Sequence, residues 1–400
     1  MKTKALFFGI IFLFLLNSCY SDGDFEPISC ESHLGFDTSK GDIILASQQQ
    51  VIAFGNKSIS HIKGHLYIGH CTDRGANNIQ NIDALSSITQ IDGNLIIAKN
   101  NKLSSILGLQ NLERIGGVLS IVDNSSLKNL HGLHNLSSIG RVLNISLMNE
   151  LENLDDFEKL SSIGSLDLWA NQNIDNLNGL LSVTSLHGYV SLIMNDALTT
   201  VRGLRNINMD TIEYLKIESN KELLNLNGLE KLQTIASDKN GIEQGQLLIL
   251  SNQKLKNISA LRNLTDISNS IEVRWNPVLT TIEGLSGLTS ANGLLWITDN
   301  NQLLSIDGLR NITTTSGSLV IFNNDIITDI DGLGALSHIG TTLDIFDNAR
   351  LANLCGLTKL LQTDGGLKEG SFTTNAPYYN IKDNLYNPTR ENLTNGNCSQ

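Results

Sequence analysis

The first group of side chains that could do chemistry lies near the start of the chain and contains residue types that bind zinc. It consists of His61, His65, His70 and Cys71. The group straddles a segment in which Leu66 and Ile68 alternate with period two, the pattern of a strand whose apolar side chains point inward. The imidazoles would then lie at corners on either side of the strand, without a common centre. We therefore expect no metal and no other cofactor.

Carboxylates are the second group, because two of them at a suitable separation can cleave a glycosidic bond. The acidic residues at predicted exposed positions include Asp155, Asp156, Asp329 and Asp331. Nothing in the sequence pattern brings such a pair together, and the chain contains no G-x-S-x-G or H-E-x-x-H motif. The sequence thus predicts no catalytic residues. An enzyme acting on polysaccharides is the least favoured alternative.

Cys19 is a thiol with a specific predicted fate. It follows Lys2, Lys4 and an apolar run over residues 5–16, which is shorter than a membrane span and typical of a signal peptide. Leu16-Asn17-Ser18-Cys19 resembles the bacterial lipobox, in which the cysteine thiol is diacylated. The resemblance implies a lipoprotein signal peptide at residues 1–18 and a lipid anchor on Cys19. An ordinary secretory signal with an incidental cysteine is the alternative.

The segment after Cys19 is acidic. Residues 20–26 read YSDGDFE, which resembles the short export tag of Gram-negative lipoproteins that reach the outer face of the outer membrane. We expect an acidic linker at residues 19–29 and a lipid-anchored, surface-exposed location on the cell outer membrane, since two or three acyl chains anchor stably. A solvated acidic linker without targeting function is the alternative.

The other four cysteines could form disulfides, as expected for an exported protein. They are Cys30, Cys71, Cys355 and Cys398. The simplest pairing is Cys30 with Cys71 and Cys355 with Cys398, each clamping one end of the chain. Four cysteines permit three connectivities, and four buried reduced thiols are a further alternative.

Aromatic side chains gather in the last four units of a repeat that runs through the chain. They are Trp275, Trp296, Phe322 and Phe346, with Arg274, Asp299 and Asp344 beside them. These residues are predicted to point outward or to lie near a corner, so that neighbouring units stack them into a strip with polar edges. Such a strip suits a protein hot spot or the face of a sugar. The alternative is that residues 362–400 fold over the strip and bury it.

The repeat itself is the frame that positions these groups. Residues 117–140 read GVLSIVDNSSLKNLHGLHNLSSIG, and the motif L-x-I-x-x-N recurs through the chain. It begins at Leu66, Leu95, Leu119, Leu143, Leu166, Val190, Leu215, Leu247, Ile271, Leu295, Leu319 and Leu343, and seven of the eleven spacings are 24 residues. Such repetition indicates a solenoid, and the alternation in L-x-I indicates strands. The prediction is a mainly β solenoid of about twelve coils, roughly 55 Å long at about 4.8 Å per coil.

Two polar constants are predicted to make the corners of each coil. Asparagine recurs at the sixth position of the motif, where stacked amides could bond the backbone of neighbouring coils. Glycine recurs later in each coil, as at Gly108 and Gly132, and is predicted to take a positive φ there.

The pattern I-x-G-x-L-x-I-x-x-N…L-x-x-L-x-G-L resembles the receptor L domain, a relative of leucine-rich repeats. The resemblance covers about residues 56–361 and implies a right-handed β-helix that binds a ligand without catalysis. The chain is longer than receptor domains and has fewer cysteines. No motif allows the binding residues of those domains to be transferred.

The ends of a solenoid need caps that cover the first and last core positions. We expect an N-terminal cap at residues 30–65, with strands at 43–45 and 51–54, the repeat solenoid at 66–361 and a C-terminal cap at 362–400. These follow the signal peptide and linker in the chain.

Composition narrows the choice of partner. The formal net charge of −12 over 400 residues makes nucleic acid an unfavourable partner. The prediction is a surface lipoprotein, tethered to the outer membrane through its acyl chains, that acts as a binding or adhesion scaffold for a protein or glycan ligand. A glycan-capture accessory of a polysaccharide-uptake system is the main alternative.

Overall fold

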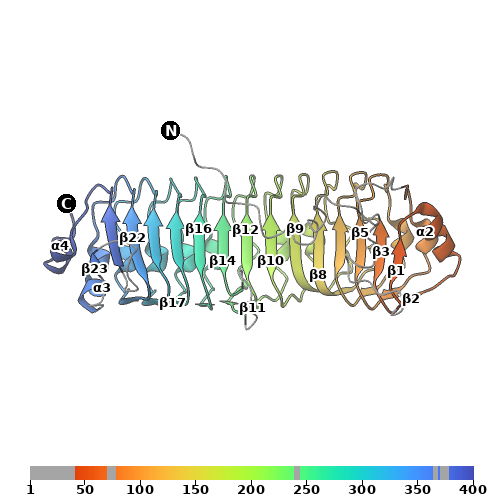
Figure 1. The fold of residues 1–400 in the computed structure, drawn as a ribbon, viewed down its shortest axis with the longest axis horizontal. Helices are drawn as coiled ribbons and strands as arrows, with labels where there is room; N and C mark the ends of the chain where they lie inside the picture. Colours follow the sequence, from red (N-terminus) through yellow and green to blue (C-terminus); the bar gives the residue numbers. More distant parts are fainter. Residues whose placement is uncertain (1–40, 70–77, 238–243, 364–367, 370–377) are drawn as a thin grey trace, which may run out of the picture.

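A computed structural model of the chain describes residues 41–69, 78–237, 244–363, 368–369 and 378–400. The predicted signal peptide, the linker, Cys19 and Cys30 lie outside these residues, as do His70 and Cys71. The described residues form one elongated rod, in which each coil adds one strand to a long parallel sheet (Figure 1). The prediction of a mainly β solenoid is confirmed.

The long sheet runs through the whole rod, and each strand pairs in parallel with the strand of the next coil. Its strands are β1 (Ile43–Leu45), β3 (Leu66–Gly69), β5 (Leu95–Ala98), β7 (Leu119–Val122), β8 (Ser138–Ser146), β9 (Ser162–Trp169), β10 (Val190–Ile193), β12 (Leu215–Glu218), β14 (Leu247–Leu250), β16 (Ile271–Arg274), β18 (Leu295–Thr298), β20 (Leu319–Phe322), β22 (Thr342–Phe346), β24 (Tyr378–Lys382) and, beside β24, β23 (Lys368–Glu369).

The L-x-I motif forms these strands because its two apolar residues fill the core of the coil. In β18, Leu295 and Ile297 are fully buried, whereas Trp296 between them keeps part of its surface. The register pairs Leu295 with Leu319 and Ile297 with Ile321, so identical positions stack along the rod. The result is one continuous apolar core from the first coil to the last.

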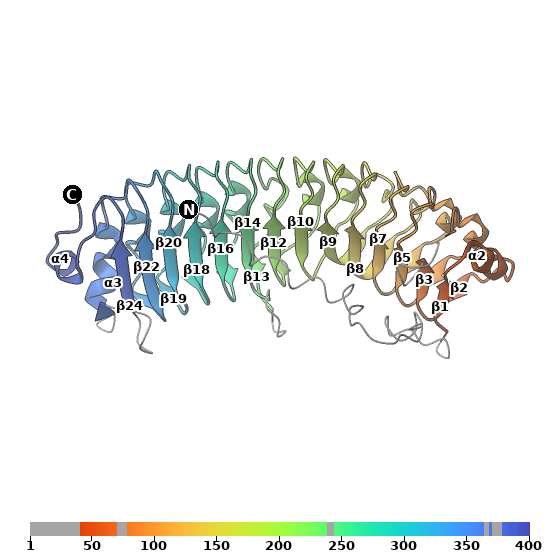
Figure 2. The same ribbon diagram turned by 45° about the horizontal axis from the view of Figure 1, so that its top comes forward.

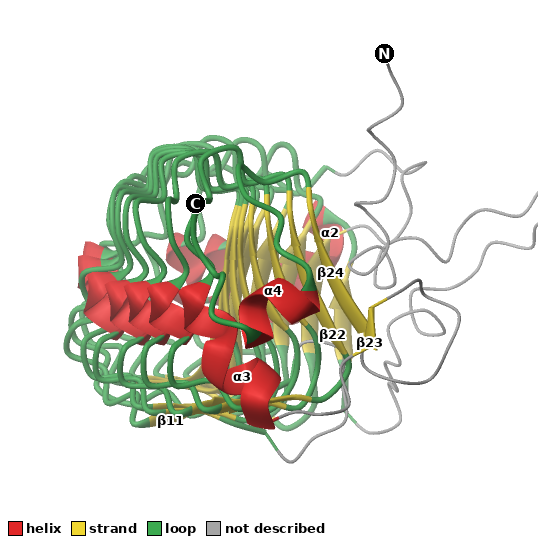
Figure 3. Ribbon diagram, turned by 90° about the vertical axis from the view of Figure 1, so that its left-hand side faces the viewer, coloured by secondary structure: helices red, strands yellow, loops and turns green. Residues whose placement is uncertain are grey.

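Two further sides complete each coil (Figure 3). One side carries two-residue strands: β2 (His61–Ile62), β4 (Gln90–Ile91), β6 (Arg114–Ile115), β11 (Thr211–Ile212), β13 (Thr234–Ile235), β15 (Asp266–Ile267), β17 (Ser290–Ala291), β19 (Thr314–Thr315) and β21 (His338–Ile339). Another side carries 3₁₀ turns: η3 (Asp83–Leu85), η4 (Leu107–Leu109), η5 (Asn178–Leu180), η6 (Arg202–Leu204), η7 (Ser259–Leu261), η8 (Glu283–Leu285), η9 (Asp307–Leu309), η10 (Asp331–Leu333) and η11 (Cys355–Leu357). The turns stack in a row opposite the long sheet.

The asparagine corner forms the predicted ladder between coils. The backbone N–H of Asn100 donates to Oδ1 of Asn124 at 3.1 Å, and its Nδ2 donates to the carbonyl of Ile68 at 3.0 Å. The same bonds recur in the following coils except the one with Met148 at this position, and every asparagine of the ladder is buried. The chain itself turns one residue earlier, where Lys99 and its equivalents have a φ near +55°.

The predicted positive φ at the repeat glycines is wrong for most of them. Among these glycines only Gly132 and Gly228 are left-handed, with φ of 128° and 120°. The others are glycine because the coils approach closely. A Cβ on Gly203 would lie 1.7 Å from the carbonyl oxygen of Leu177 in the preceding coil, and one on Gly308 would lie 2.0 Å from that of Ile282.

Helices and an extra coil close the two ends of the rod (Figure 2). Residues 51–54, predicted as a strand, belong to helix α2 (Gln48–Gly55), because the Ser47 side chain caps the helix and Val51 and Phe54 share its buried face. At the other end, β24 pairs with β22 and Asn384 continues the ladder by accepting from the N–H of Asn348 at 3.1 Å. Helices α3 (Thr358–Thr363) and α4 (Arg390–Thr394) lie at this end. Within the described ranges, no helix has the length and apolar character needed to cross a bilayer.

Candidate functional site

The outward side of the long sheet, here called the outer face, carries the aromatic residues singled out in the sequence. Each coil contributes three positions to it: the residues before, between and after the two buried residues of the L-x-I motif. In the last coils the parallel register places one row as Glu272, Trp296, Val320, Asp344 and Asn380, and a second as Arg274, Thr298, Phe322, Phe346 and Lys382.

Arg274 and the two tryptophans form a sandwich on this face. The guanidinium carbon of Arg274 lies 3.7 Å from the centre of the Trp296 ring and 4.1 Å from that of Trp275. Its Nη1 donates to Oε2 of Glu272, the Cα partner of Trp296, at 2.8 Å. Only 11% of the Arg274 side chain is exposed. The cation thus contacts two aromatic rings and a carboxylate in the free protein.

Phe322 and Phe346 form a second stack one coil further on. Their ring centres are 4.6 Å apart and their planes differ by 10°. Nζ of Lys382 lies 5.8 Å from the centre of the Phe346 ring. Because Lys382 belongs to β24, which is the next strand of the sheet, this part of residues 362–400 extends the strip instead of covering it. Both rings remain half-buried, as do Trp275 and Trp296.

The predicted acidic neighbours have other partners. Oδ1 of Asp299 accepts from Nδ2 of Asn323 at 2.5 Å, at the left-handed corner. Asp344 is buried and accepts from Nδ2 of Asn380 at 2.9 Å and from Oγ1 of Thr342 at 3.2 Å. The structure therefore joins Arg274 to the tryptophans and the phenylalanines to each other, while these two carboxylates hold the sheet together.

Sequence reasoning missed a further aromatic stack in the middle of the rod. Tyr189 and Tyr214 have ring centres 4.5 Å apart and planes that differ by 9°. Each stands directly before the first buried residue of its strand, the first of the three outward positions of a coil. Counting that position would have found them. Tyr67, at the other end of the outer face, is buried, and burial raises its pKa to about 12.

Stacking along the rod decides which part of each ring a ligand can reach. The ring separations of 4.5 and 4.6 Å are close to the spacing of about 4.8 Å between neighbouring strands. In each pair, therefore, one face of each ring is covered by the other ring. The facing surfaces of both tryptophans are likewise occupied by Arg274. Within these stacks, the ring surfaces that face each other or Arg274 are therefore not open to a ligand.

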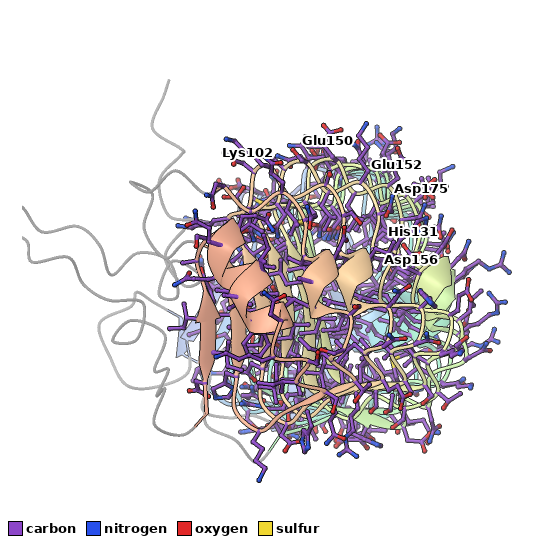
Figure 4. The ribbon with its side chains drawn as sticks, turned by 90° about the vertical axis from the view of Figure 1, so that its right-hand side faces the viewer. Lys102, His131, Glu150, Glu152, Asp156 and Asp175 are labelled. Carbon is purple, nitrogen blue, oxygen red and sulfur yellow. A yellow bond between two sulfur atoms is a disulfide. The ribbon has the colours of Figure 1, made fainter. Side chains whose placement is uncertain are left out.

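Among the residues that the structure describes, carboxylates and imidazoles meet in pairs and form no group of three that could hold a metal ion. Asp155 is exposed as predicted, but Asp156 is buried, because Oδ2 accepts from the N–H of Leu130 at 2.8 Å and Oδ1 bonds Nδ1 of His131. His131 and Asp156 lie together on one side of the rod (Figure 4). Asp156 therefore supports the turn of the preceding coil.

The two described histidines of the possible zinc group, His61 and His65, have separate partners. Nε2 of His61 lies 2.9 Å from Oδ2 of Asp92, and this hydrogen bond lowers the pKa of Asp92. Nδ1 of His65 accepts instead from the N–H of Asn94 at 2.7 Å. Over the described ranges, no three metal-ligating side chains come together.

A disulfide joins Cys355 to Cys398, the pairing preferred from the sequence, across a sequence separation of 43 residues. It lies where the end of the chain pairs with the last coil: the N–H of Leu354 donates to the carbonyl of Cys398 at 2.8 Å. Asn353 forms an antiparallel bridge with Ser399. This disulfide fastens the end of the chain to the 3₁₀ turn η11 of the last coil.

Comparison with known proteins finds a family match for one part of the chain. Residues 60–142 match the family model of the receptor L domain, so the predicted resemblance is confirmed for that part of the chain. The crystal structure of the TLR13–ssRNA13 complex is similar to 85% of this chain at 16% identity, with a TM-score of 0.31. The alignment covers 57% of that chain, so this chain spans little more than half of its length. No curated protein matches the sequence.

Proposed function

We propose that the protein is a non-catalytic scaffold that binds a protein ligand through the C-terminal half of its outer face. The receptor L domain match over residues 60–142 supports a ligand-binding role for the solenoid. The observation that carries the proposal is the stacked strip of Arg274, Trp275, Trp296, Phe322 and Phe346 on a rigid sheet. Tryptophan and arginine are the residues most enriched in protein hot spots, and here they contact one another on the outer face.

The orientation of the rings favours a protein over a glycan. A sugar packs its C–H bonds against an open ring face, and the inner faces of both stacks are occupied by neighbouring rings or by a guanidinium. Half-buried apolar surface suits the mixed side chains of a protein partner. Glycan capture remains the second candidate, because all four rings of the strip keep part of their surface.

Binding assays on the purified chain separate the two candidates. The chain is applied to a glycan array and to a panel of extracellular and cell-surface proteins, together with the double variant Trp275→Ala, Trp296→Ala. A matched control, Ile96→Ala with Val122→Ala, removes outward side chains from the other half of the same face. We expect binding to a protein that the tryptophan variant loses by at least tenfold and the control retains. Glycan binding lost in the same variant would establish glycan capture, and turnover of a polysaccharide would reject both.

We also propose that the scaffold is tethered to the outer membrane through acyl chains on Cys19. The signal sequence and the lipobox-like residues before Cys19 support this location. Protease treatment of intact cells should remove the protein, and Cys19→Ala should release it from the membrane fraction. Survival of the protein in intact cells would place it on the periplasmic side.

A further inference from the structure

Buried polar atoms without a hydrogen-bond partner concentrate at one point of the outer face. The described part of the chain contains four such side-chain atoms: Gln244 Oε1, Arg274 Nε, Trp296 Nε1 and Thr298 Oγ1. Three of the four belong to β16 and β18, where Arg274 and Thr298 are Cα partners and Trp296 lies on the same side of the sheet. A buried polar group without a partner is unfavourable and rare in a folded protein, so three in one place need a cause.

The chemistry of these atoms specifies what would satisfy them. Arg274 Nε and Trp296 Nε1 can only donate, and the Thr298 hydroxyl can also donate. The charge of Arg274 is already balanced by Glu272 at 2.8 Å. An added carboxylate would therefore lie beside Glu272 and be repelled. Neutral oxygen acceptors, each with two lone pairs, fit the three donors without that penalty.

We propose that Arg274, Trp296 and Thr298 form the polar centre of the binding surface and take main-chain carbonyls from an uncharged segment of the partner protein. The inference rests on the proposed function and adds the chemistry of the contact. The Phe322–Phe346 stack lies in the adjoining coils, since Phe322 is the Cα partner of Thr298. The centre is thus a small set of hydrogen-bond donors bordered by aromatic side chains. Protein hot spots have this composition, with surrounding contacts that exclude water.

Access to the centre depends on Arg274. Thr298 is fully buried in the free protein, and the guanidinium lies between the two indoles. A change of side-chain rotamer at an interface is common on binding, and the long Arg274 side chain is the one able to move without disturbing the sheet. The partner's carbonyls then accept hydrogen bonds from buried donors that have no partner in the free protein.

Two isosteric threonine-to-valine variants test the inference, because we expect them to affect the midpoint of thermal unfolding differently. Thr298→Val removes a hydroxyl without a partner, so we expect the midpoint of thermal unfolding to stay the same or to rise. Thr315→Val is the matched control, because Thr315 is equally buried but its Oγ1 donates to the carbonyl of Gly293 at 2.8 Å. That variant should unfold at a lower temperature. A lower midpoint for Thr298→Val would show that its hydroxyl is already satisfied and would overturn the inference.

The binding readout uses peptides selected on the purified wild-type chain from a random-peptide library. We expect selected peptides to be uncharged at the contact, to bind Thr298→Val and Trp296→Phe about tenfold more weakly, and to bind Thr315→Val as they bind the wild type. Equal binding to the wild type and Thr298→Val, or selection of acidic peptides, would overturn the inference and leave the scaffold function standing. Binding of neutral polysaccharides without any peptide or protein would instead reject the proposed function.

Discussion

The coil at residues 143–165 and the coil at residues 295–318 occupy equivalent places in the repeat but fill its polar positions with different side chains. The asparagine position holds Met148 in the first coil and Asn300 in the second. The glycine position holds Asp156 or Gly308, and the apolar position after it holds Phe157 or Leu309. Both coils nevertheless pair in parallel with their neighbours and bury the same apolar positions. The comparison shows that the apolar positions define the fold, while the polar positions can be exchanged if an adjacent coil adjusts.

The glycine position shows what that adjustment is. In two coils the glycine position is occupied by another residue, Asp156 or Ala260, and the coil before each of them has a glycine at that position. The glycine of the preceding coil is left-handed in these two cases, Gly132 before Asp156 and Gly228 before Ala260, and in no other described repeat glycine. A β-carbon in this position would otherwise meet the carbonyl of the preceding coil. The side chain is therefore accommodated by a change of φ one coil earlier, which only glycine makes without strain.

Asn300→Met copies Met148 into the regular coil and should have the largest effect on stability. Asn300 donates through Nδ2 to the carbonyl of Val273 at 2.9 Å, and its Oδ1 accepts from the N–H of Asn276 at 3.1 Å. Both backbone groups would be left buried without these partners, at a cost of roughly 3–5 kcal/mol. Urea unfolding followed by circular dichroism measures the loss. A change below about 1 kcal/mol would mean that the ladder is dispensable in every coil.

Gly284→Ala and Gly308→Ala form a matched pair that tests the proposed adjustment. A Cβ at either position would lie 2.0 Å from a carbonyl oxygen of the preceding coil, that of Ile258 or Ile282. The coil before Gly308 has a glycine that can become left-handed, whereas the coil before Gly284 has Ala260. We expect Gly284→Ala to lower the free energy of unfolding by about 1–3 kcal/mol more than Gly308→Ala does. Equal losses, measured by the same urea titration, would show that the left-handed glycines are unrelated to the next coil.

The same comparison explains which features of the fold could be predicted from the sequence. Leu295, Ile297 and Asn300 could be assigned from the sequence because a side chain that stacks on its own copies must recur in register. Asp156 was misjudged as exposed because its burial depends on a backbone change at Gly132, which no local pattern records. Helix α2 was missed for a related reason: it lies outside the repeat, and its short apolar segment also suits a strand.

The outer face was predictable only in part. Its outward parity follows from L-x-I, so Trp296 and Phe322 were placed correctly on the outside of the sheet. The sandwich of Arg274 between two indoles depends on side-chain rotamers, and these are not encoded in the spacing. Which ring faces are covered could therefore not be predicted from the sequence.

Asp156→Ala separates the carboxylate from the backbone adjustment in the irregular coil. The variant keeps a β-carbon in the glycine position, so Gly132 should stay left-handed. It removes the acceptor for the N–H of Leu130, a bond of 2.8 Å within a buried turn. We expect a loss of about 1–2 kcal/mol in the free energy of unfolding. His131→Ala is the control, because its side chain is 69% exposed and should contribute much less. Equal losses in the two variants would assign the stabilisation to the His131 contact.

Met148→Asn should have the smallest effect and the opposite sign. The Met148 sulfur lies 3.9 Å from Nδ2 of Asn124, where the regular coils place an amide oxygen. The N–H of Met148 already donates to Oδ1 of Asn171 at 3.2 Å, so the backbone at this corner has the geometry of the ladder. An amide here would complete the ladder between Asn124 and Asn171 and replace a weak acceptor by a strong one, while losing the apolar contacts of a fully buried methionine. We expect a net gain of about 0.5–1 kcal/mol, measured as a higher urea midpoint. A loss would mean that the irregular coil has adapted its packing to the thioether, and that the two coils differ in their apolar positions as well.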